Sequence, residues 1–292
     1  MHLSVIVPYR PGEERLGRCL AGIDATLAAA GAAWEVVAVE GADGVSAARN
    51  EGLARARGEW IAWVDADDEV LPAWAPRIDA CLRSMEADGS CGVLVFGAEV
   101  VRRLARLEVR PCRSETLLHS ADFMRGCLLE CMGSTWLWNK VFRRSLFDGV
   151  RFAGRTQEDF RIMPRLLARC ERVLAIPDVL YRYAPPEGSL THGGGGGPNA
   201  RGIEEAFADR FEGAGLPPSF APLWKEACAL RAADRLFNGG RDAALWRLLA
   251  ANAWRVLLDR EQSVRAKVKC LAALAGISRT VTGTVTVTGN GR

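Results

Sequence analysis

The sequence predicts an α/β fold in which helices flank a mostly parallel central sheet and a helical region follows. Three short apolar runs are rich in β-branched and aromatic residues, as is typical of buried strands: Leu3–Val7, Trp34–Val39 and Trp60–Val64. The segments between these runs carry apolar residues at helical spacing. This β-α-β-α-β order requires parallel strands joined by right-handed crossovers. Strand patterns are lost after Pro198, which predicts the helical region.

The helices expected around these strands each have one apolar face. Gly31 suits the C-cap of the first helix, Ser46 the N-cap of the second, and Pro72 the first position of the third. The apolar face of the first helix consists of Leu16, Leu20, Ile23, Leu27 and Ala30, and that of the second of Ala48, Leu53 and Ala56. The apolar face of the third consists of Trp74, Ile78, Cys81, Leu82 and Met85. Because these residues recur at helical spacing, each helix can bury one face against the sheet.

The middle of the chain continues the mixed pattern. Residues 101–116 are charged and irregular, and they receive no assignment. The predicted elements are a strand over Gly92–Gly97, a helix over Ser120–Glu130, a strand at a sheet edge within Trp136–Phe142, a helix over Gln157–Cys170 with Phe160, Met163, Leu167 and Cys170 aligned, and one or two short strands over Val173–Tyr183.

A run of five glycines, Gly193–Gly197, precedes Pro198 and is the clearest domain boundary in the sequence. It predicts a sheet domain over residues 1–192 and a linker over 193–200. A helical region over 201–280 and a flexible tail or single strand over 281–292 follow. Helical spacing within that region covers 201–212, 219–237, 241–259 and 263–276.

The composition excludes several classes of protein. A net charge of +3 without a basic stripe does not favour nucleic-acid binding, and three histidines do not favour a His-rich zinc site. Nine scattered cysteines are typical of reduced thiols in the cytosol. The chain enters a strand at Leu3, which predicts no signal peptide, and no apolar run reaches the roughly 18 residues needed to span a bilayer. A cytoplasmic location is expected.

Three carboxylates follow directly after the Trp60–Val64 strand, in the sequence Asp65-Ala66-Asp67-Asp68. In an open α/β sheet, ligands bind outside the carboxyl ends of the strands. Like charges this close repel, so a positive group should hold them ionised, and Mg²⁺ or Mn²⁺ prefers oxygen ligands. Asp65 and Asp67 are therefore candidate metal ligands. The alternative is an acidic turn that caps the next helix.

A second acidic pair, Glu158 and Asp159, opens the Gln157–Cys170 helix. Acids at this position also stabilise the helix dipole, which is the structural alternative. Two acidic clusters suit transfer of a group from a diphosphate to a hydroxyl, because a metal can stabilise the leaving diphosphate and a separate carboxylate can take the hydroxyl proton. No G-x-G-x-x-G or G-x-x-x-x-G-K-[ST] motif is present, which disfavours dinucleotide oxidoreductases and P-loop enzymes.

Several motifs in order resemble glycosyltransferase family 2, the inverting enzymes of the GT-A fold, in the branch that makes bacterial polysaccharides. The resemblance covers residues 2–192 and implies a nucleotide-sugar donor, a divalent cation and sugar transfer with inversion. Its motifs are Ser4-Val5-Ile6-Val7-Pro8-Tyr9, Ser46-Ala47-Ala48-Arg49-Asn50-Glu51-Gly52-Leu53, Gly58 to Asp68 with its D-x-D sequence, Trp138-Asn139-Lys140-Val141-Phe142, Gln157-Glu158-Asp159-Phe160, Tyr181-Arg182-Tyr183 and Gly188-Ser189-Leu190-Thr191-His192.

The resemblance also implies roles for individual residues. Asp159 would be the general base, with Glu158 as the second choice, and Asp67 would bind the metal together with Asp65. His192 is a candidate third metal ligand or phosphate contact, with an ordinary loop histidine as the alternative. The nucleotide sugar would be contacted by Pro8, Tyr9, Glu40, Arg49, Asp65 and Lys140. Arg49 as a solvated helix residue and Lys140 as a surface lysine are the alternatives, and Trp136 and Trp138 are expected in the core rather than against a sugar.

One segment departs from the family pattern. After its second strand the family usually has Asp-Asp-Gly-Ser, whose acid reads the base of the nucleotide. This chain has Val39-Glu40-Gly41-Ala42-Asp43 instead. Glu40 or Asp43 would take the place of that acid, so a UDP-sugar is favoured as the donor without being fixed by the motif.

The sequence therefore predicts an inverting, metal-dependent glycosyltransferase acting on a glycan or lipid-linked acceptor in surface polysaccharide or glycolipid synthesis. One alternative is an inactive relative that binds nucleotide sugars or proteins. A nucleotidyltransferase is disfavoured because Pro11-Gly12-Glu13-Glu14-Arg15 is too acidic for its phosphate loop. Residues 263–276 carry Arg265, Lys267 and Lys269 beside Val264, Val268 and Leu271. Core packing is favoured there, and peripheral contact with anionic lipid at the inner membrane face is the alternative.

Overall fold

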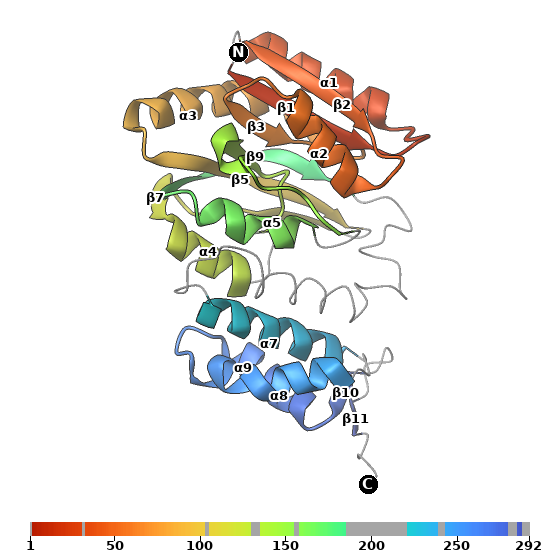
Figure 1. Cartoon of the computed structure of the whole chain (residues 1–292), viewed down its shortest axis with the longest axis vertical. Coiled ribbons are helices and arrows are strands. Elements are labelled where there is room, and N and C mark those ends of the chain that lie inside the picture. The colour runs from red at the N-terminus through yellow and green to blue at the C-terminus, as the bar shows by residue number, and fades with distance from the viewer. Residues whose placement is uncertain are drawn as a thin grey trace. The chain divides into compact units, whose positions relative to one another are not determined.

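The computed structural model describes residues 2–30, 33–102, 105–129, 135–154, 158–184, 221–238, 243–279 and 285–287. These residues form two compact units (Figure 1). The described residues up to Met124 and those from Thr135 to Ala184 form the sheet unit. Arg125–Leu129 and the described residues from Ala221 onward form the helical unit. The Gly193–Gly197 run and the 201–212 segment lie outside the described residues, so the predicted linker stays a prediction.

The sheet unit is built on one mixed sheet with the strand order β2-β1-β3-β8-β5-β9-β4. Its amino-terminal half is the predicted parallel unit, because β1 pairs in parallel with both β2 and β3. The strands along this path are β1 (Leu3–Tyr9), β2 (Trp34–Glu40), β3 (Trp60–Trp63), β4 (Glu69–Val70), β5 (Cys91–Arg102), β8 (Lys140–Arg143) and β9 (Arg172–Tyr183).

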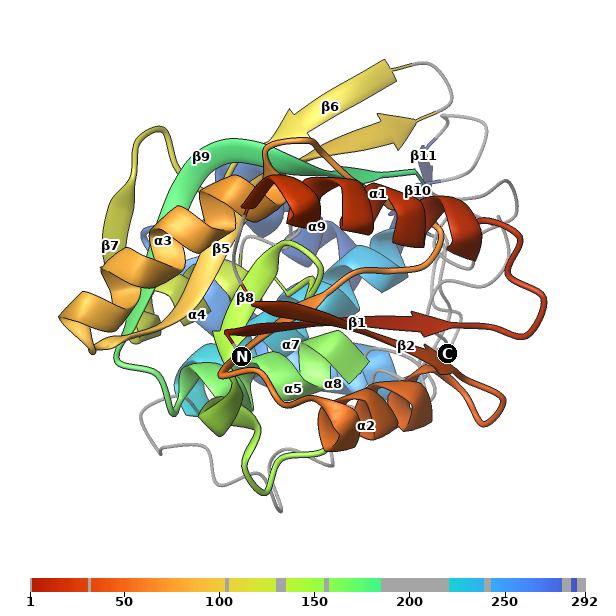
Figure 2. The same ribbon diagram turned by 90° about the horizontal axis from the view of Figure 1, so that it is seen from above.

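Helices cover both faces of this sheet (Figure 2). Helices α1 (Leu16–Ala30) and α3 (Trp74–Asp88) lie over one face, and α2 (Val45–Arg55) and α5 (Glu158–Leu167) lie over the other. The alternation of β1 explains this arrangement. Val5 and Val7 belong to the core beneath α1 and α3, whereas a Cβ added to Gly52 of α2 would lie 2.3 Å from Ile6 Cγ2. The glycine of the second motif is therefore needed for close helix packing.

Two helix starts differ from the sequence prediction. The N-cap of α2 is Gly44, with φ of 101°, and Ser46 instead donates its hydroxyl to the Gly154 carbonyl at 2.6 Å. Glycine can adopt this positive φ without strain, so the backbone turns two residues earlier than expected. Helix α3 begins at Trp74, and Pro72 lies in the preceding turn. The predicted apolar face of α3 is confirmed, because all five of its residues are buried.

The prediction of a sheet edge within Trp136–Phe142 is wrong. Strand β8 lies inside the sheet, antiparallel to β3 on one side and to β5 on the other. Its side chains Val141 and Phe142 are completely buried. β8 has only four residues, and both its first residue, Lys140, and its last, Arg143, are charged. Its apolar pattern is therefore weak even though the strand is central.

The segment without an assignment, residues 101–116, contains one strand and the first residue of another. β6 (Ala105–Val109) folds back antiparallel on β5, and β7 (Thr116–His119) pairs antiparallel with β9. Helix α4 (Ser120–Leu129) follows, and η1 (Arg144–Phe147) is a single 3-10 turn after β8. β9 is one continuous strand rather than two, even though Pro177 lies within it.

The helical unit contains α7 (Ala221–Phe237), α8 (Ala243–Leu258) and α9 (Val264–Leu274), as the helical spacing predicts. Figure 1 shows the three helices packed together. After α9, β10 (Ile277–Arg279) pairs antiparallel with β11 (Val285–Val287), so the tail contributes a strand. None of the described helices is long and apolar enough to cross a lipid bilayer.

A carboxyl cluster joins α4, α7 and the end of α8. Glu226 of α7 is 7% exposed, and Arg125 donates from Nε to Glu261 at 2.5 Å and also pairs with Asp259. Burial, together with a hydrogen bond to the charged Asp259, raises the pKa of Glu226 to about 7. Burial also raises the pKa of Asp259, but the Glu261 amide, the Glu226 carboxyl and Arg125 lower it further, so its net shift is downward.

The Glu226 carboxyl should make the helical unit less stable as the pH rises. Its folded pKa of about 7 lies above the ordinary value of 4.5, so its contribution is complete below about pH 4.5 and is lost as the pH rises through about 7. The loss between pH 5 and pH 8 is expected to be on the order of 1–3 kcal/mol. Glu226→Gln should remove this part of the slope, because its amide can still donate to Asp259. Hydrogen exchange of α7 amides at both pH values measures it, and equal slopes in both proteins would contradict the assignment.

Candidate active site

The acidic turn leaves the sheet at the carboxyl end of β3, as predicted. The Val64 amide donates to the Ile6 carbonyl at 3.0 Å, which keeps the chain beside β1, and the Asp68 amide donates to the Asp65 carbonyl at 3.0 Å. This tight turn brings three carboxylates together beyond the carboxyl end of β3, which pairs in parallel with β1. Burial raises the pKa of Asp65, and Asp67 and Glu158 raise it further, while Arg49 opposes them.

Asp68 is the buried member of the three. It is 2% exposed, and it accepts hydrogen bonds from the Tyr181 hydroxyl at 2.9 Å and from the Ala184 amide at 3.0 Å. Burial and the neighbouring Asp65 and Asp67 raise its pKa to about 8. The Tyr181 hydroxyl also accepts from the Asp65 amide at 3.1 Å. Asp68 thus anchors the turn to the end of β9.

Asp67 points to the loop after β1. Its Oδ2 lies 3.1 Å from Nη2 of Arg15, and the same guanidinium donates to the Ala184 carbonyl at 3.0 Å. Burial raises the pKa of Asp67, whereas Arg15 lowers it, and the net shift is upward. About a third of the Asp67 side chain remains exposed, so this carboxylate is accessible to a ligand.

Arg49 links the two acidic clusters. Its Nη1 donates to Oε1 of Glu158, and its Nη2 lies 3.4 Å from Oδ1 of Asp65. The guanidinium carbon lies 5.9 Å from the ring centre of Trp63 and 5.6 Å from that of Phe152. Burial lowers the pKa of Arg49, but Glu158, Asp65 and Asp159 together raise it above its usual value. The alternative of a solvated helix residue is excluded, because Arg49 is 6% exposed.

Glu158 and Asp159 occupy the first turn of α5, as predicted. Both are half-buried. Successive side chains on a helix point about 100° apart, so the two acids cannot face the same direction. Glu158 is turned toward Arg49, and Asp159 is close enough to raise the pKa of that arginine. Residues far apart in the sequence thus form one site from α2, β3 and α5.

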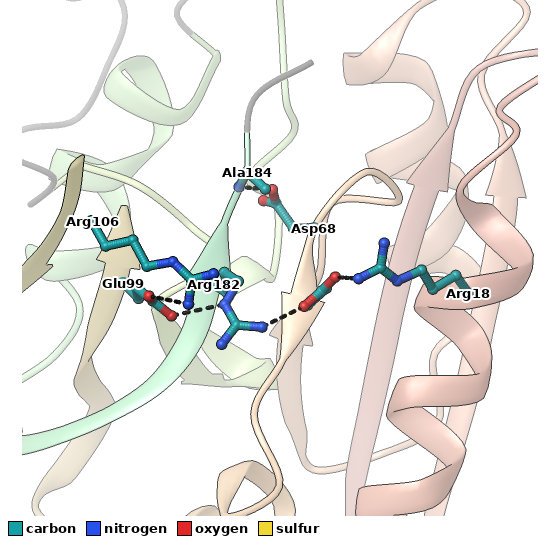
Figure 3. Close-up of polar contacts among 7 residues, drawn as sticks. Arg18, Asp68, Glu99, Arg106, Arg182 and Ala184 are labelled. Carbon is teal, nitrogen blue, oxygen red and sulfur yellow. Dashed lines mark hydrogen bonds and ion pairs between the residues drawn. The ribbon is translucent and has the colours of Figure 1, made fainter. Parts of the chain in front are cut away.

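An ion-pair ladder fixes the strand that follows the acidic turn (Figure 3). Arg182 of β9 donates to Glu69 of β4 at 2.7 Å and to Glu99 of β5 at 2.7 Å. Arg18 of α1 also pairs with Glu69, and Arg106 of β6 with Glu99. Because β4 begins directly after Asp68, the ladder limits the freedom of the whole turn.

Lys140 is completely buried at the start of β8, which excludes the surface-lysine alternative. Its ammonium donates to the Trp136 carbonyl at 2.6 Å and to Oδ1 of Asn139 at 2.7 Å. Trp138 stacks on Tyr181, with ring centres 4.6 Å apart, and on Trp136 at 4.5 Å. Trp138 is buried, as expected for a core residue.

The remaining predicted residues occupy different positions. Tyr9 and Glu40 are register partners at the ends of β1 and β2; Tyr9 is half-buried and Glu40 is exposed. Pro8 is buried. His192 lies outside the described residues. The described residues bring Arg49, Asp65 and Glu158 into contact, with Asp159 nearby, and Asp67 is held by Arg15 on the other side of the turn.

Asp65 and Asp67 fit a divalent cation by the chemistry of their side chains. Both have carboxylate groups that remain partly exposed, and burial and their proximity raise the pKa of Asp65. A cation between them would relieve that repulsion. Mg²⁺ is usually held by one or two carboxylates together with substrate phosphates, so two ligands are sufficient. The described part of the chain shows no group of three or more His, Cys, Asp or Glu residues arranged to hold a metal ion.

Sequence reasoning missed Arg15 and gave no role to Asp68. Arg15 lies in a loop whose acidic composition hides a cation that folds back onto Asp67. For Asp68 a weak signal exists, because its partner Tyr181 lies in a motif near the end of the sheet domain. The pairing itself depends on β4 adding to β9, which no local pattern reveals.

The chain is similar in sequence to one protein-family model and to several curated bacterial proteins. Residues 24–148 match the family model described as Glycosyl transferase family 2. The chain is 29% identical over 163 residues to the uncharacterized glycosyltransferase EpsJ of Bacillus subtilis (strain 168), covering 51% of this chain and 44% of that protein. It is 28% identical over 168 residues to the succinoglycan biosynthesis protein ExoO of Rhizobium meliloti (strain 1021), covering 53% and 46%. The chain spans less than half the length of these curated relatives.

A solved structure shows the same fold. The structure of S. aureus TarS 1-349 in complex with UDP-GlcNAc has a TM-score of 0.56 at 17% identity, covering 94% of this chain and 80% of that one. The mixed sheet flanked by helices is thus a GT-A-like fold, as predicted. The part of the chain that matches the family model, residues 24–148, carries β2, β3, β5 and β8, so this half of the sheet unit is similar in sequence to glycosyltransferase family 2.

Proposed function

We propose that this chain transfers a sugar from a nucleotide-diphosphate sugar to a hydroxyl acceptor, with inversion at the anomeric carbon and with a divalent cation. The observation that carries the proposal is the pair of acidic clusters at one sheet end, held at a fixed separation by Arg49. Inversion by single displacement needs a base on the acceptor side and charge stabilisation on the donor side. Two clusters with separate partners can supply both.

Asp159 is the proposed base. Glu158 is committed to Arg49, so its carboxylate is held in place and its charge is neutralised by the guanidinium. Asp159, on the adjacent position of the same helical turn, points in a different direction and can accept the proton of the acceptor hydroxyl as that oxygen attacks. The bond from the acceptor oxygen to the anomeric carbon forms while the bond to the leaving diphosphate breaks.

Asp65 and Asp67 would hold the cation, which when bound stabilises the negative charge on the leaving diphosphate. The protein's own contribution is orientation. Asp68, Tyr181 and the ion-pair ladder fix the turn, and Arg15 positions the Asp67 carboxylate. Tyr9 and Glu40, which are register partners at the ends of β1 and β2, would contact the nucleoside.

The biological role is proposed from the relatives. ExoO is described as a succinoglycan biosynthesis protein, which favours a glycan or lipid-linked acceptor in surface polysaccharide synthesis for this chain as well. The TarS structure holds UDP-GlcNAc, so UDP-sugars are the first donors to test. A cytoplasmic location, where nucleotide sugars are made, is part of this proposal.

Nucleotide binding should depend on both the cation and Asp67. Adding UDP or a UDP-sugar with Mn²⁺ should raise the melting temperature, since a ligand at about 100 times its dissociation constant adds about 2.7 kcal/mol to stability. Asp67→Ala should abolish the Mn²⁺-dependent part. Asp178→Ala, which removes a partly exposed aspartate of β9 paired with Arg77, is the matched control and should keep the full shift.

A negative result has a defined meaning. If a panel of UDP-, GDP- and dTDP-sugars with Mn²⁺ or Mg²⁺ produces no shift in the wild-type protein, a nucleotide-sugar donor is wrong for this chain. If nucleotide binds but Asp67→Ala retains the Mn²⁺ dependence, the cation is held elsewhere. If binding is intact and no transfer to any acceptor occurs, the alternative of an inactive nucleotide-sugar-binding relative is favoured.

A further inference from the structure

The outer faces of α8 and α9 carry large apolar side chains that remain open to solvent. Trp254 is 52% exposed, Leu258 72% and Val264 77%. The sequence favours core packing for α9, but the buried residues of this helix are Cys270 and Ala273 only. The α8–α9 stripe is defined here by the exposed apolar residues of both helices, which are Trp246, Trp254, Leu258, Val264, Val268 and Leu271.

The spacing of these residues places them on one side of each helix. Val264, Val268 and Leu271 follow the i, i+4, i+7 pattern, and Trp254 and Leu258 are four residues apart. The two helices form a hairpin. Leu258 and Val264 flank its short connection, and at the other end the indole of Trp246 donates to the Leu274 carbonyl at 3.3 Å. The exposed apolar side of α8 and that of α9 are thus carried by two helices that lie side by side.

The charges around the stripe have one sign. Helices α8 and α9 contain Arg247, Arg255, Arg265, Lys267 and Lys269, and they contain no Asp or Glu. The Arg255 guanidinium lies 4.3 Å from the ring centre of Trp254. The acids of the connection, Asp259 and Glu261, are both held by Arg125, and Lys269 is paired with Asp234 of α7. The hairpin is thus apolar on its outer face and basic around it.

We propose that the α8–α9 stripe docks this chain on a lipid bilayer that contains anionic headgroups. Tryptophan rings are enriched at membrane interfaces, and an amphipathic helix with Lys or Arg beside Trp, Leu and Val lies in the plane of the interface. The surface potential of anionic lipid attracts each nearby Lys or Arg. Each such residue should increase partitioning onto the bilayer about fivefold, the equivalent of about 1 kcal/mol. A second copy of this face would instead bring equal positive charges together.

This proposal does not rest on the transfer reaction. The stripe belongs to the helical unit, and the catalytic candidates belong to the sheet unit. Lipid binding can therefore fail while activity remains, and it can also be present in a protein that transfers no sugar. If both proposals hold, docking would bring the enzyme to acceptors carried on lipid.

Vesicle co-sedimentation of the full chain tests the proposal. The protein should bind phosphatidylcholine vesicles containing phosphatidylglycerol at least about tenfold more tightly than pure phosphatidylcholine, and high salt should weaken that binding. Arg265→Gln with Lys267→Gln should lower partitioning by about 25-fold. Val264→Ser with Val268→Ser and Leu271→Ser should abolish it. Leu107→Ser with Leu117→Ser, which changes exposed leucines of the sheet unit, is the matched control and should have no effect.

Several outcomes would overturn the proposal. Equal binding to neutral and anionic vesicles would exclude recognition of anionic lipid. Unchanged binding by both the glutamine variant and the serine variant, with unfolding curves like those of the wild type, would place any lipid contact elsewhere. A third outcome is that the wild type does not bind vesicles, and light scattering shows that it is a dimer whereas the serine variant is a monomer. That outcome would assign the stripe to contact with a second copy of this chain.

Discussion

Replacing Asp159 with asparagine is expected to lower the turnover number about 10²- to 10⁴-fold while leaving donor affinity nearly unchanged. Asparagine keeps the size and most of the hydrogen bonding of aspartate, but it cannot accept the proton of the acceptor hydroxyl. The proposed donor contacts lie at the other acidic cluster, where Asp65 pairs with Arg49. Initial rates with a competent acceptor, measured beside calorimetric titration with nucleotide diphosphate and Mn²⁺, separate the two effects.

Glu158→Gln provides the control for this assignment. Glu158 is bound to Arg49, so its loss should lower stability and disturb the position of the arginine rather than remove a base. Its effect on turnover should be smaller than that of Asp159→Asn. If Glu158→Gln shows the large loss of turnover and Asp159→Asn does not, the two roles should be exchanged. If Asp159→Asn weakens nucleotide binding as much as Asp67→Ala does, Asp159 belongs to the donor site.

The parallel half of the sheet could be predicted from the sequence because its signals are local. The strands β1, β2 and β3 are short runs of mainly apolar residues, and α1 and α3 have apolar residues at helical spacing. Each of these elements buries a face that its own residues define. The predicted span of α1 agrees with the observed Leu16–Ala30 for this reason.

Elements whose burial depends on distant partners could not be assigned from their own residues. β8 is central only because β3 and β5 both pair with it, and its charged ends give it the pattern of an edge. β6 and β7 are stabilised by pairing with β5 and β9 rather than by apolar residues of their own. The N-cap of α2 is Gly44 rather than Ser46, and the Ser46 hydroxyl instead donates to Gly154, more than a hundred residues away.

The candidate site shows the same limit. Motif order identified Asp65, Asp67, Glu158 and Asp159 as the acids, and the fold brings Asp65 and Glu158 to the same arginine. The need for a positive group beside the acids also followed from their repulsion. The sequence did not show which positive groups lie beside these acids. The contacts of Arg15 and Arg49 depend on how two loops and a helix meet. Arg49 in particular has a structural role that its motif does not reveal.

Replacing Arg49 with methionine should destabilise the sheet unit by about 3 kcal/mol. Methionine retains the apolar stem beside Trp63 and Phe152 but leaves the Glu158 and Asp65 carboxylates without a cation. The expected cost is at the lower end for a broken buried ion pair, because Asp65 is still partly exposed. Hydrogen exchange of β1 and β3 amides reports on this unit alone. Arg55→Met, on the same helix but in an exposed pair with Glu51, should change stability by less than about 0.5 kcal/mol.

The double variant Arg49→Met with Glu158→Gln identifies the cause of that loss. If the instability comes from the uncompensated Glu158 charge, removing that charge as well should restore a substantial part of the stability, because the two residues are in direct contact. If the two losses simply add, Arg49 stabilises the fold through its packing on the aromatic rings and not through Glu158. A loss below about 1 kcal/mol in the single variant would show that Arg49 is not what holds the two acidic clusters together.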